Sequence, residues 1–176
     1  NAASMDTRVK AVATSVMYDM SRAMGHGVGD GKDRYSTSDR RAVLQYLNAQ
    51  RWKDAENGTF AHGGHDIYVD KNGKVTAAER ILPEALPDNP NPVLKEFFDY
   101  YRMPRGFHAR SVNSTGAWTA TTPLSFMNMP LLSYGREITI PTLIVTGEKA
   151  HSRYFAEDAF KAVGSKQKEL VIVPGA

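Results

Sequence analysis

The loop Gly147-Glu148-Lys149-Ala150-His151 directly follows an apolar run at residues 141–146. In open α/β sheets, ligands bind beyond the carboxyl ends of the strands, so a site is expected at such a loop. A carboxylate in this position can orient and stabilise an imidazole, which is the supporting role in a nucleophile–base–acid triad. The alternative is that Glu148 and Lys149 are ordinary solvated loop charges. The loop alone leaves both interpretations open.

A second group of side chains, His62, His65 and Asp66, has the nitrogen and oxygen donors that zinc accepts. Their spacing is loose, two glycines separate the histidines, and no third histidine lies nearby in the sequence. These features favour a solvated loop over a metal site. We therefore predict no metal and no cofactor, and keep zinc binding at these three residues as an alternative.

Residues 102–132 are rich in serine, threonine, asparagine, methionine and aromatic residues. This mixture is typical of a pocket for an apolar substrate, because apolar walls with a few polar groups bind such ligands. The candidate substrate-binding residues are Trp118, Phe126, Met127 and Met129. The alternative is that these side chains pack between an insertion and the main domain.

Three segments are predicted to be strands, namely 8–16, 141–147 and 169–175, the last two being continuous runs of Val, Ile and Leu closed by glycine. Continuous apolar strands are typical of parallel sheets that are covered on both faces. Residues 152–164 lie between the last two strands and show helical spacing, with Ser152 and Gly164 as expected caps. Strand, helix and strand form a βαβ unit with a right-handed crossover.

The middle of the chain, residues 19–115, interrupts the order of the strands and is predicted to be a mainly helical insertion, or lid. A helix is expected from about Ser38 to Trp52 because apolar residues recur there at helical spacing. An Asn-Gly pair within 68–76 predicts a hairpin. A second helix is expected where Asn91 precedes Pro92, and a further helical stretch near 124–136.

Composition excludes several classes of protein. The chain has 176 residues, 41% of them apolar and 23% charged, which is ordinary for a globular domain. Its net charge of +3 is spread without a basic stripe, so nucleic acid is not an expected partner. No apolar stretch approaches the roughly 20 residues of a membrane span. Without cysteine, disulfides and thiolate metal sites are excluded, which leaves the cellular compartment undecided. We predict a cytoplasmic protein, and its oligomeric state is open.

Nucleotide-binding and nucleophile motifs are missing from the sequence. There is no G-x-S-x-G turn that would expose a serine, no G-x-G-x-x-G and no phosphate-binding P-loop. The first residues lack both an initiator methionine and an apolar signal core, and the last residue follows directly on a turn signal after a strand. We therefore expect that both ends of the chain were cut from a longer protein.

Four blocks in the sequence, residues 6–20, 118–132, 141–160 and 168–176, together resemble the α/β-hydrolase superfamily. The greatest similarity is to its dienelactone-hydrolase-like branch, and it covers nearly the whole chain. The resemblance implies that the three predicted strands are the sixth, seventh and eighth strands of that fold. The expected fold is thus a partial α/β-hydrolase fold, with its core at 1–18 and 116–176 and its lid at 19–115.

The resemblance also implies an activity, acyl transfer from a small ester, thioester or lactone through a Ser or Cys nucleophile, a histidine and an acid. The acid follows the seventh strand and the histidine the eighth. The superfamily pattern places an Asp two or three positions after the glycine, where this chain has Lys149 and Ala150, so Glu148 is the nearest carboxylate. His151 lies on the acid loop and is not the expected base.

The nucleophile is expected upstream of Asn1 and the histidine just beyond Ala176. The chain alone is then expected to be inactive and to need the remaining N-terminal half of the hydrolase fold as its partner. The alternative is a non-catalytic relative with the hydrolase fold, kept for binding or as a scaffold.

Overall fold

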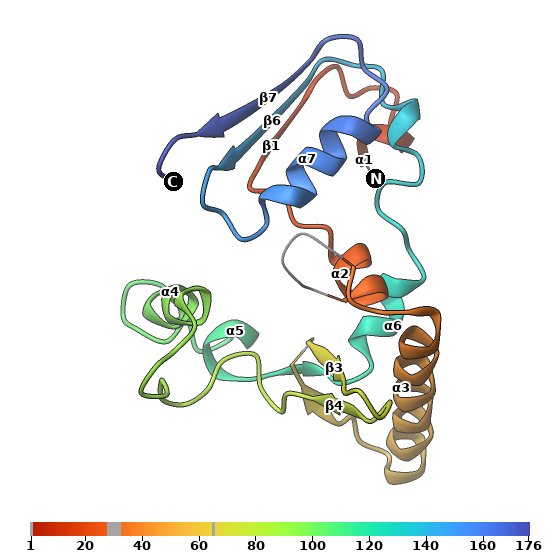
Figure 1. Ribbon diagram of the computed structural model, residues 1–176, viewed down its shortest axis with the longest axis vertical. Coiled ribbons are helices and arrows are strands. Elements are labelled where there is room, and N and C mark those ends of the chain that lie inside the picture. Colours follow the sequence, from red (N-terminus) through yellow and green to blue (C-terminus); the bar gives the residue numbers. More distant parts are fainter. Residues whose placement is uncertain (1, 28–32, 65) are drawn as a thin grey trace. The chain divides into compact units, whose positions relative to one another are not determined.

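The computed structural model describes residues 2–27, 33–64 and 66–176 (Figure 1). These residues form two compact units. The first, termed the sheet unit, contains residues 2–23 and 129–176, and the second, termed the insertion unit, contains residues 24–27 and 33–128. Within the described residues, no helix combines the length and the apolar character that a membrane span requires.

A parallel sheet forms the centre of the sheet unit. Its three strands are β1 (Val12–Ser15), β6 (Thr142–Gly147) and β7 (Lys168–Val173), in the order β1-β6-β7. The protein is therefore a mixed α/β structure with a parallel sheet flanked by helices, as the apolar runs predicted. Of the predicted first strand, 8–16, only residues 12–15 pair with β6. The Val12 amide donates to the carbonyl of Pro141 at 2.9 Å, and proline, lacking an N–H, offers no donor to extend the ladder.

Helix α7 (Arg153–Ala162) connects β6 to β7 and packs against one face of the sheet (Figure 1). The core between them contains Ile144, Phe155, Ala156 and Ala159, each at most 2% exposed. Ser152 occupies the predicted N-cap position, but its side chain makes no capping hydrogen bond.

The expected glycine cap of α7 was wrong, because the C-cap is Val163. Gly164 serves a different purpose. A Cβ atom there would lie 2.0 Å from the carbonyl oxygen of Arg136, and the Gly164 amide donates to the Gly135 carbonyl at 3.1 Å. This glycine therefore allows two backbone segments to cross closely.

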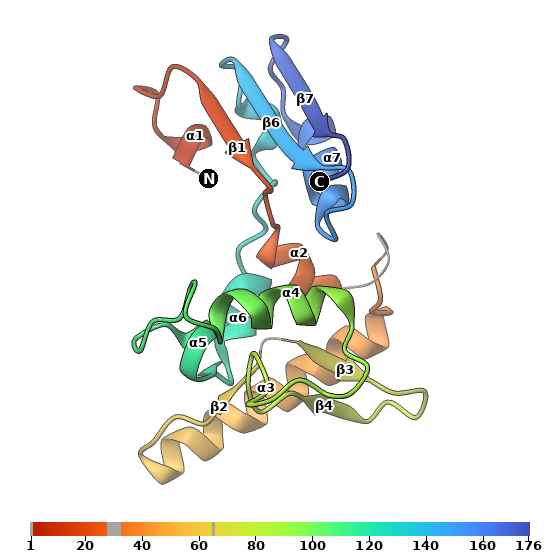
Figure 2. The ribbon, with the colours of Figure 1, turned by 90° about the vertical axis from the view of Figure 1, so that its left-hand side faces the viewer.

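On the opposite face of the sheet, none of the described helices covers β6 and β7 (Figure 2). Side chains alternate along a strand, so Leu143 points away from the side on which its neighbours Thr142 and Ile144 are buried. Leu143 is 37% exposed and Val173, at the end of β7, is 39% exposed. The apolar runs predict cover on both faces, and α7 supplies it on one.

The shorter elements complete the sheet unit and connect it to the rest of the chain. They are α1 (Ala2–Met5), α2 (Met20–His26), within which the boundary between the units falls, and the 3-10 helix η1 (Gly135–Glu137). Together with α6 (Thr122–Met127), η1 replaces the single helical stretch predicted near 124–136. Pro130 restricts the residue before it to extended conformations, which prevents one continuous helix.

The insertion unit is organised around α3 (Thr37–Asn57), whose buried apolar side chains are Val43 and Leu47. The helix starts at a capping box in which the Ser36 hydroxyl accepts from the Asp39 amide at 3.1 Å, while Asp39 accepts from the Ser36 amide at 2.9 Å. The sequence predicted a helix from about Ser38 to Trp52, and α3 extends beyond this range at both ends, to Thr37 and Asn57.

The remaining elements of the insertion unit are short. They are β2 (His62–Gly63), β3 (Ile67–Val69), β4 (Val75–Ala77), α4 (Pro92–Tyr101), α5 (Val112–Thr115) and β5 (Trp118–Thr119). The predicted hairpin is confirmed by the antiparallel pair β3–β4, with Gly73 in the left-handed conformation at its turn. The Asn91 cap is confirmed too, since its side chain accepts from the Val93 amide at 2.9 Å. Pairing of β2 with β5 was not predicted.

Candidate functional site

The carboxyl ends of β6 and β7 bring the predicted acid against the turn that follows the last strand. Glu148 comes directly after β6, and its Oε2 accepts a hydrogen bond from the Gly175 amide at 2.8 Å. The Glu148 amide in turn donates to the Val173 carbonyl at 3.0 Å. Two residues that are 27 positions apart in the sequence are thus fixed together at one edge of the sheet.

Gly147 makes this approach of the two loops feasible. A Cβ atom at this position would lie 2.6 Å from the carbonyl oxygen of Ala176, a distance at which backbone atoms must shift. The Lys149 amide donates to the same carbonyl at 2.6 Å. The sequence carries a signal for this arrangement, because both apolar runs are closed by glycine, at Gly147 and Gly175.

The Glu148 carboxylate is exposed and is well placed to accept further hydrogen bonds. An ionised carboxylate has about four acceptor positions on two oxygens, and one bond to Gly175 uses only part of that capacity. The guanidinium of Arg153 is held by Glu157 at 2.8 Å and donates to the Glu148 backbone carbonyl at 3.4 Å. Glu148 can therefore hold an additional donor, such as an imidazole N–H, beside the turn after β7.

Asp158, the other carboxylate near this loop in the sequence, lies within α7 and forms ion pairs with Arg22 and Lys161. His151 lies in the turn before α7, exposed, with its ring centroid 6.0 Å from that of Tyr18. Tyr18 also stacks against Phe155, at 4.6 Å. The acid loop thus carries Glu148 at the strand end and His151 at the helix start, in contact with an aromatic cluster.

The four predicted pocket residues lie in different places. Trp118 in β5 and Phe126 in α6 are half-buried, and their ring centroids are 6.0 Å apart. Met127 is buried in the insertion unit, at 8% exposure. Met129 is 52% exposed and belongs to the sheet unit. Trp118 and Phe126 are therefore near each other, Met127 is part of the core of the insertion unit, and Met129 is exposed.

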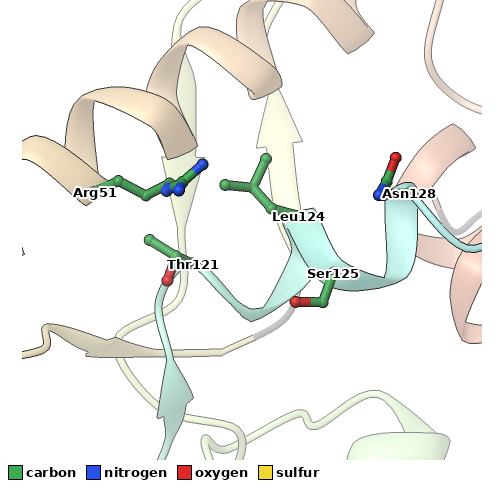
Figure 3. A pocket seen from close by; sticks show the side chains of 5 residues that line it. All are labelled: Arg51, Thr121, Leu124, Ser125 and Asn128. Carbon is green, nitrogen blue, oxygen red and sulfur yellow. The ribbon is translucent and has the colours of Figure 1, made fainter.

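A hollow of about 350 Å³ lies between α3 and α6 and is lined by Arg51, Thr121, Leu124, Ser125 and Asn128 (Figure 3). None of the four predicted pocket residues lines this hollow, although four of its lining residues come from the same segment, 118–129. The guanidinium of Arg51 extends from α3 toward the α6 side (Figure 3). The hollow is wide open and mostly polar, unlike the apolar pocket that the sequence predicted.

The alternative metal site has only two members within the described residues. His62 is in β2 and pairs with Thr119 of β5, and Asp66 lies just before β3, whereas His65 is outside the described residues. No group of three or more potential metal ligands is present in the part of the chain that the structure describes.

No protein-family model matches the chain. It is 47% identical, over 177 aligned residues, to the uncharacterized protein PA2218 of Pseudomonas aeruginosa, and the alignment includes 100% of this chain and 42% of that protein. The crystal structure of the hypothetical protein PA2218 superposes with a TM-score of 0.81 at 46% identity, covering 99% of this chain and 48% of that one. The two proteins share a fold. The chain spans less than half the length of this relative.

Proposed function

We propose that this chain is part of an α/β-hydrolase that transfers the acyl group of a small ester, thioester or lactone, and that Glu148 is the acid of its triad. The observation that supports the proposal is the 2.8 Å hydrogen bond from the Gly175 amide to the Glu148 carboxylate. An acid after one strand lies against the turn after the next strand, and that turn leads to the position where the superfamily that the sequence resembles has its histidine.

In the proposed mechanism, a Ser or Cys nucleophile attacks the acyl carbon while the histidine imidazole takes the nucleophile's proton. The imidazolium then gives that proton to the alkoxide or thiolate as its bond to the acyl carbon breaks, so that an alcohol or thiol is formed and an acyl-enzyme remains; in a lactone the new alcohol stays attached to the acyl chain. Water hydrolyses the acyl-enzyme by the reverse proton transfers, releasing a carboxylic acid. Glu148 accepts the hydrogen bond of the second ring N–H and stabilises the imidazolium. The nucleophile and the histidine come from polypeptide outside this chain, and the insertion unit is the lid.

Glu148 is preferred over Asp158 because of what each carboxylate already binds. Asp158 is paired with two cations, Arg22 and Lys161, within the helix side of the sheet unit. Glu148 binds a single backbone amide and is exposed at the strand end. A triad acid needs an acceptor that is held in place yet free toward the imidazole, and Glu148 meets both conditions.

The test uses a longer protein that contains these 176 residues and extends beyond both ends, assayed with p-nitrophenyl acetate. E148Q removes the charge that stabilises the imidazolium, and the expected fall in kcat is about 10⁴-fold, with KM little changed. The 176-residue chain alone is expected to show no hydrolysis above background.

The matched control is E169Q. Glu169 is an exposed glutamate on β7, opposite Leu143 of β6 and away from the carboxyl ends of the strands. Its variant should keep the wild-type rate. Activity of E148Q within tenfold of the wild-type protein would remove Glu148 from the mechanism. A longer wild-type protein without any ester, thioester or lactone hydrolysis would instead favour the non-catalytic alternative.

A further inference from the structure

Val16 has a backbone conformation that its residue type disfavours. Among the described residues, Val16 is the only residue other than glycine whose φ is positive, at 47°. For an L-amino acid, this region brings Cβ close to backbone oxygen, and a β-branched side chain makes the position a genuine outlier. Strained conformations of this kind persist where the surrounding structure holds them, and they concentrate at functional sites.

The neighbours of Val16 hold it from both sides. Its own amide donates to the Val145 carbonyl at 2.8 Å, which fixes the end of β1 to β6. Met17, the next residue, packs against the core cluster around Ile144. Asp19 is 4% exposed and accepts from the Arg22 amide at 2.9 Å at the start of α2. The chain must therefore turn at Val16, because the residues before it are paired with β6 and the residues after it are fixed in the core and at the start of α2.

The turn lies at the same edge of the sheet as the candidate acid. The parallel register pairs Ser15 with Val145, so Val16 lies level with Thr146, two residues before Glu148 on the adjacent strand. With strands about 4.8 Å apart and a rise of about 3.3 Å per residue, the Cα atoms of Val16 and Glu148 are within roughly 10 Å. The Val16 side chain is 50% exposed at this edge.

We propose that Val16 is a specificity-determining residue, whose side chain contacts the acyl chain of the substrate and limits its length. The inference rests on the proposed function, since it assigns Val16 to the acyl side of the site that Glu148 marks. An apolar, rigid side chain suits contact with a hydrocarbon group. Glycine would adopt the same backbone without strain, and a valine at this turn places an exposed apolar side chain at the edge of the site instead.

The first arm of the test measures stability and needs no activity. In the 176-residue chain, V16G should raise the thermal unfolding midpoint by about 2–4 °C, because glycine relieves the strain. The control is V112G, since Val112 is 48% exposed, close to the exposure of Val16, but begins the short helix α5. V112G should leave the midpoint unchanged or lower it. A V16G midpoint at or below that of the wild-type chain would overturn the inference.

The second arm measures selectivity in the longer protein, as kcat/KM for p-nitrophenyl octanoate divided by kcat/KM for the acetate. V16G should raise this ratio at least about tenfold, which is the discrimination that small changes in an apolar pocket produce. V112G should not change it. A ratio for V16G within twofold of the wild type, with hydrolysis retained, would overturn the role of Val16 and leave the proposed function standing.

A wild-type protein that hydrolyses neither ester would overturn the proposed function, and calorimetric binding of octanoate would then decide about Val16. Octanoate bound at least tenfold more tightly by V16G than by the wild-type protein would support an acyl-contacting side chain. Equal binding, or no binding by either protein, would refute it.

Discussion

The sheet unit and the insertion unit differ in how their elements are stabilised. In the sheet unit, two six-residue strands and α7 enclose a core in which Ile144, Phe155 and Ala156 are at most 2% exposed. In the insertion unit, the strands have two or three residues, and α4 buries none of its side chains. Its most deeply buried apolar side chains, Val43 and Leu47, belong to a single helix, whereas its other buried apolar residues, Met24, Ile67, Leu82 and Met127, are 4–8% exposed.

The difference shows how the two units can serve different tasks. A densely packed sheet can hold a carboxylate such as Glu148 at a fixed place, because strand register and core packing determine the positions of the strand ends. The insertion unit instead exposes aromatic side chains, with Phe97, Tyr100 and Phe107 all between 43% and 47% exposed. Aromatic residues that are exposed one by one are common on protein surfaces, so the contrast between the units concerns packing.

The largest effect on the free energy of unfolding is expected for a core substitution in the sheet unit, compared with a substitution in the insertion unit. F155A removes a side chain that is 1% exposed and packs against Tyr18, and should lower the free energy of unfolding by about 3–5 kcal/mol. F97A, in α4, removes a side chain that is 43% exposed and should cost about 0.5 kcal/mol or less. Urea denaturation followed by circular dichroism measures both. Similar losses for the two variants would contradict the contrast between the units.

A smaller effect is expected at two glycines that are needed for different reasons. G164A places a Cβ atom 2.0 Å from the Arg136 carbonyl oxygen in the sheet unit, which forces a backbone shift and should cost about 2–3 kcal/mol. G58A, at the end of α3, meets no neighbouring atom and carries only the strain of a φ of 65°, about 1 kcal/mol. Thermal unfolding compares them, and an equal or larger loss for G58A would refute close packing at Gly164.

The smallest effect concerns the insertion unit at alkaline pH. Burial, helped by the negative charge of Asp66, raises the pKa of Tyr35 from 10.0 to about 12, and its hydroxyl donates to the Ile67 carbonyl at 2.7 Å. Because the folded-state pKa is raised, this stabilisation is fully present below pH 10 and is lost as the pH rises through 12. Y35F should cost about 1 kcal/mol at neutral pH through the lost hydrogen bond, and should reduce the decline in stability above pH 10.

Tryptophan fluorescence is a suitable measurement for this prediction, because Trp52 and Trp118 both lie in the insertion unit. Burial raises the pKa of Tyr68 as well, so Y68F serves as the control and should remove a smaller part of the alkaline decline. An identical pH profile for Y35F and the wild-type chain would show that Tyr35 ionises equally in both states.

Local patterns in the sequence were sufficient to predict most of the elements. Continuous apolar runs identified β6 and β7 to within one or two residues, and the Asn91-Pro92 pair identified the start of α4. These signals depend on residues close together in the sequence, whose conformational preferences act before any tertiary contact forms. The position of Glu148 at a strand end followed from β6 in the same way.

The features that the sequence did not reveal depend on contacts between distant segments. The pairing of β2 with β5 joins two-residue strands whose paired residues are 55 and 57 positions apart, and strands this short have no periodicity in the sequence. The boundary between the two units, which falls just before Met129, has no signal in the sequence either. The strained turn at Val16 also arises from distant constraints, in β6 and α7, and no local signal marks it.

The parallel pairing of β1 with β6 has a consequence for folding during synthesis. Val12 pairs with Thr142, so β1 leaves the ribosome well before its partner strand exists. At the usual rates of translation of about 5–20 residues per second, the intervening chain takes about 7–26 s to make. The whole insertion unit is therefore synthesised before β6, and β1 can pair with β6 only after that, so the sheet edge that carries Val16 and Glu148 forms later than the insertion unit.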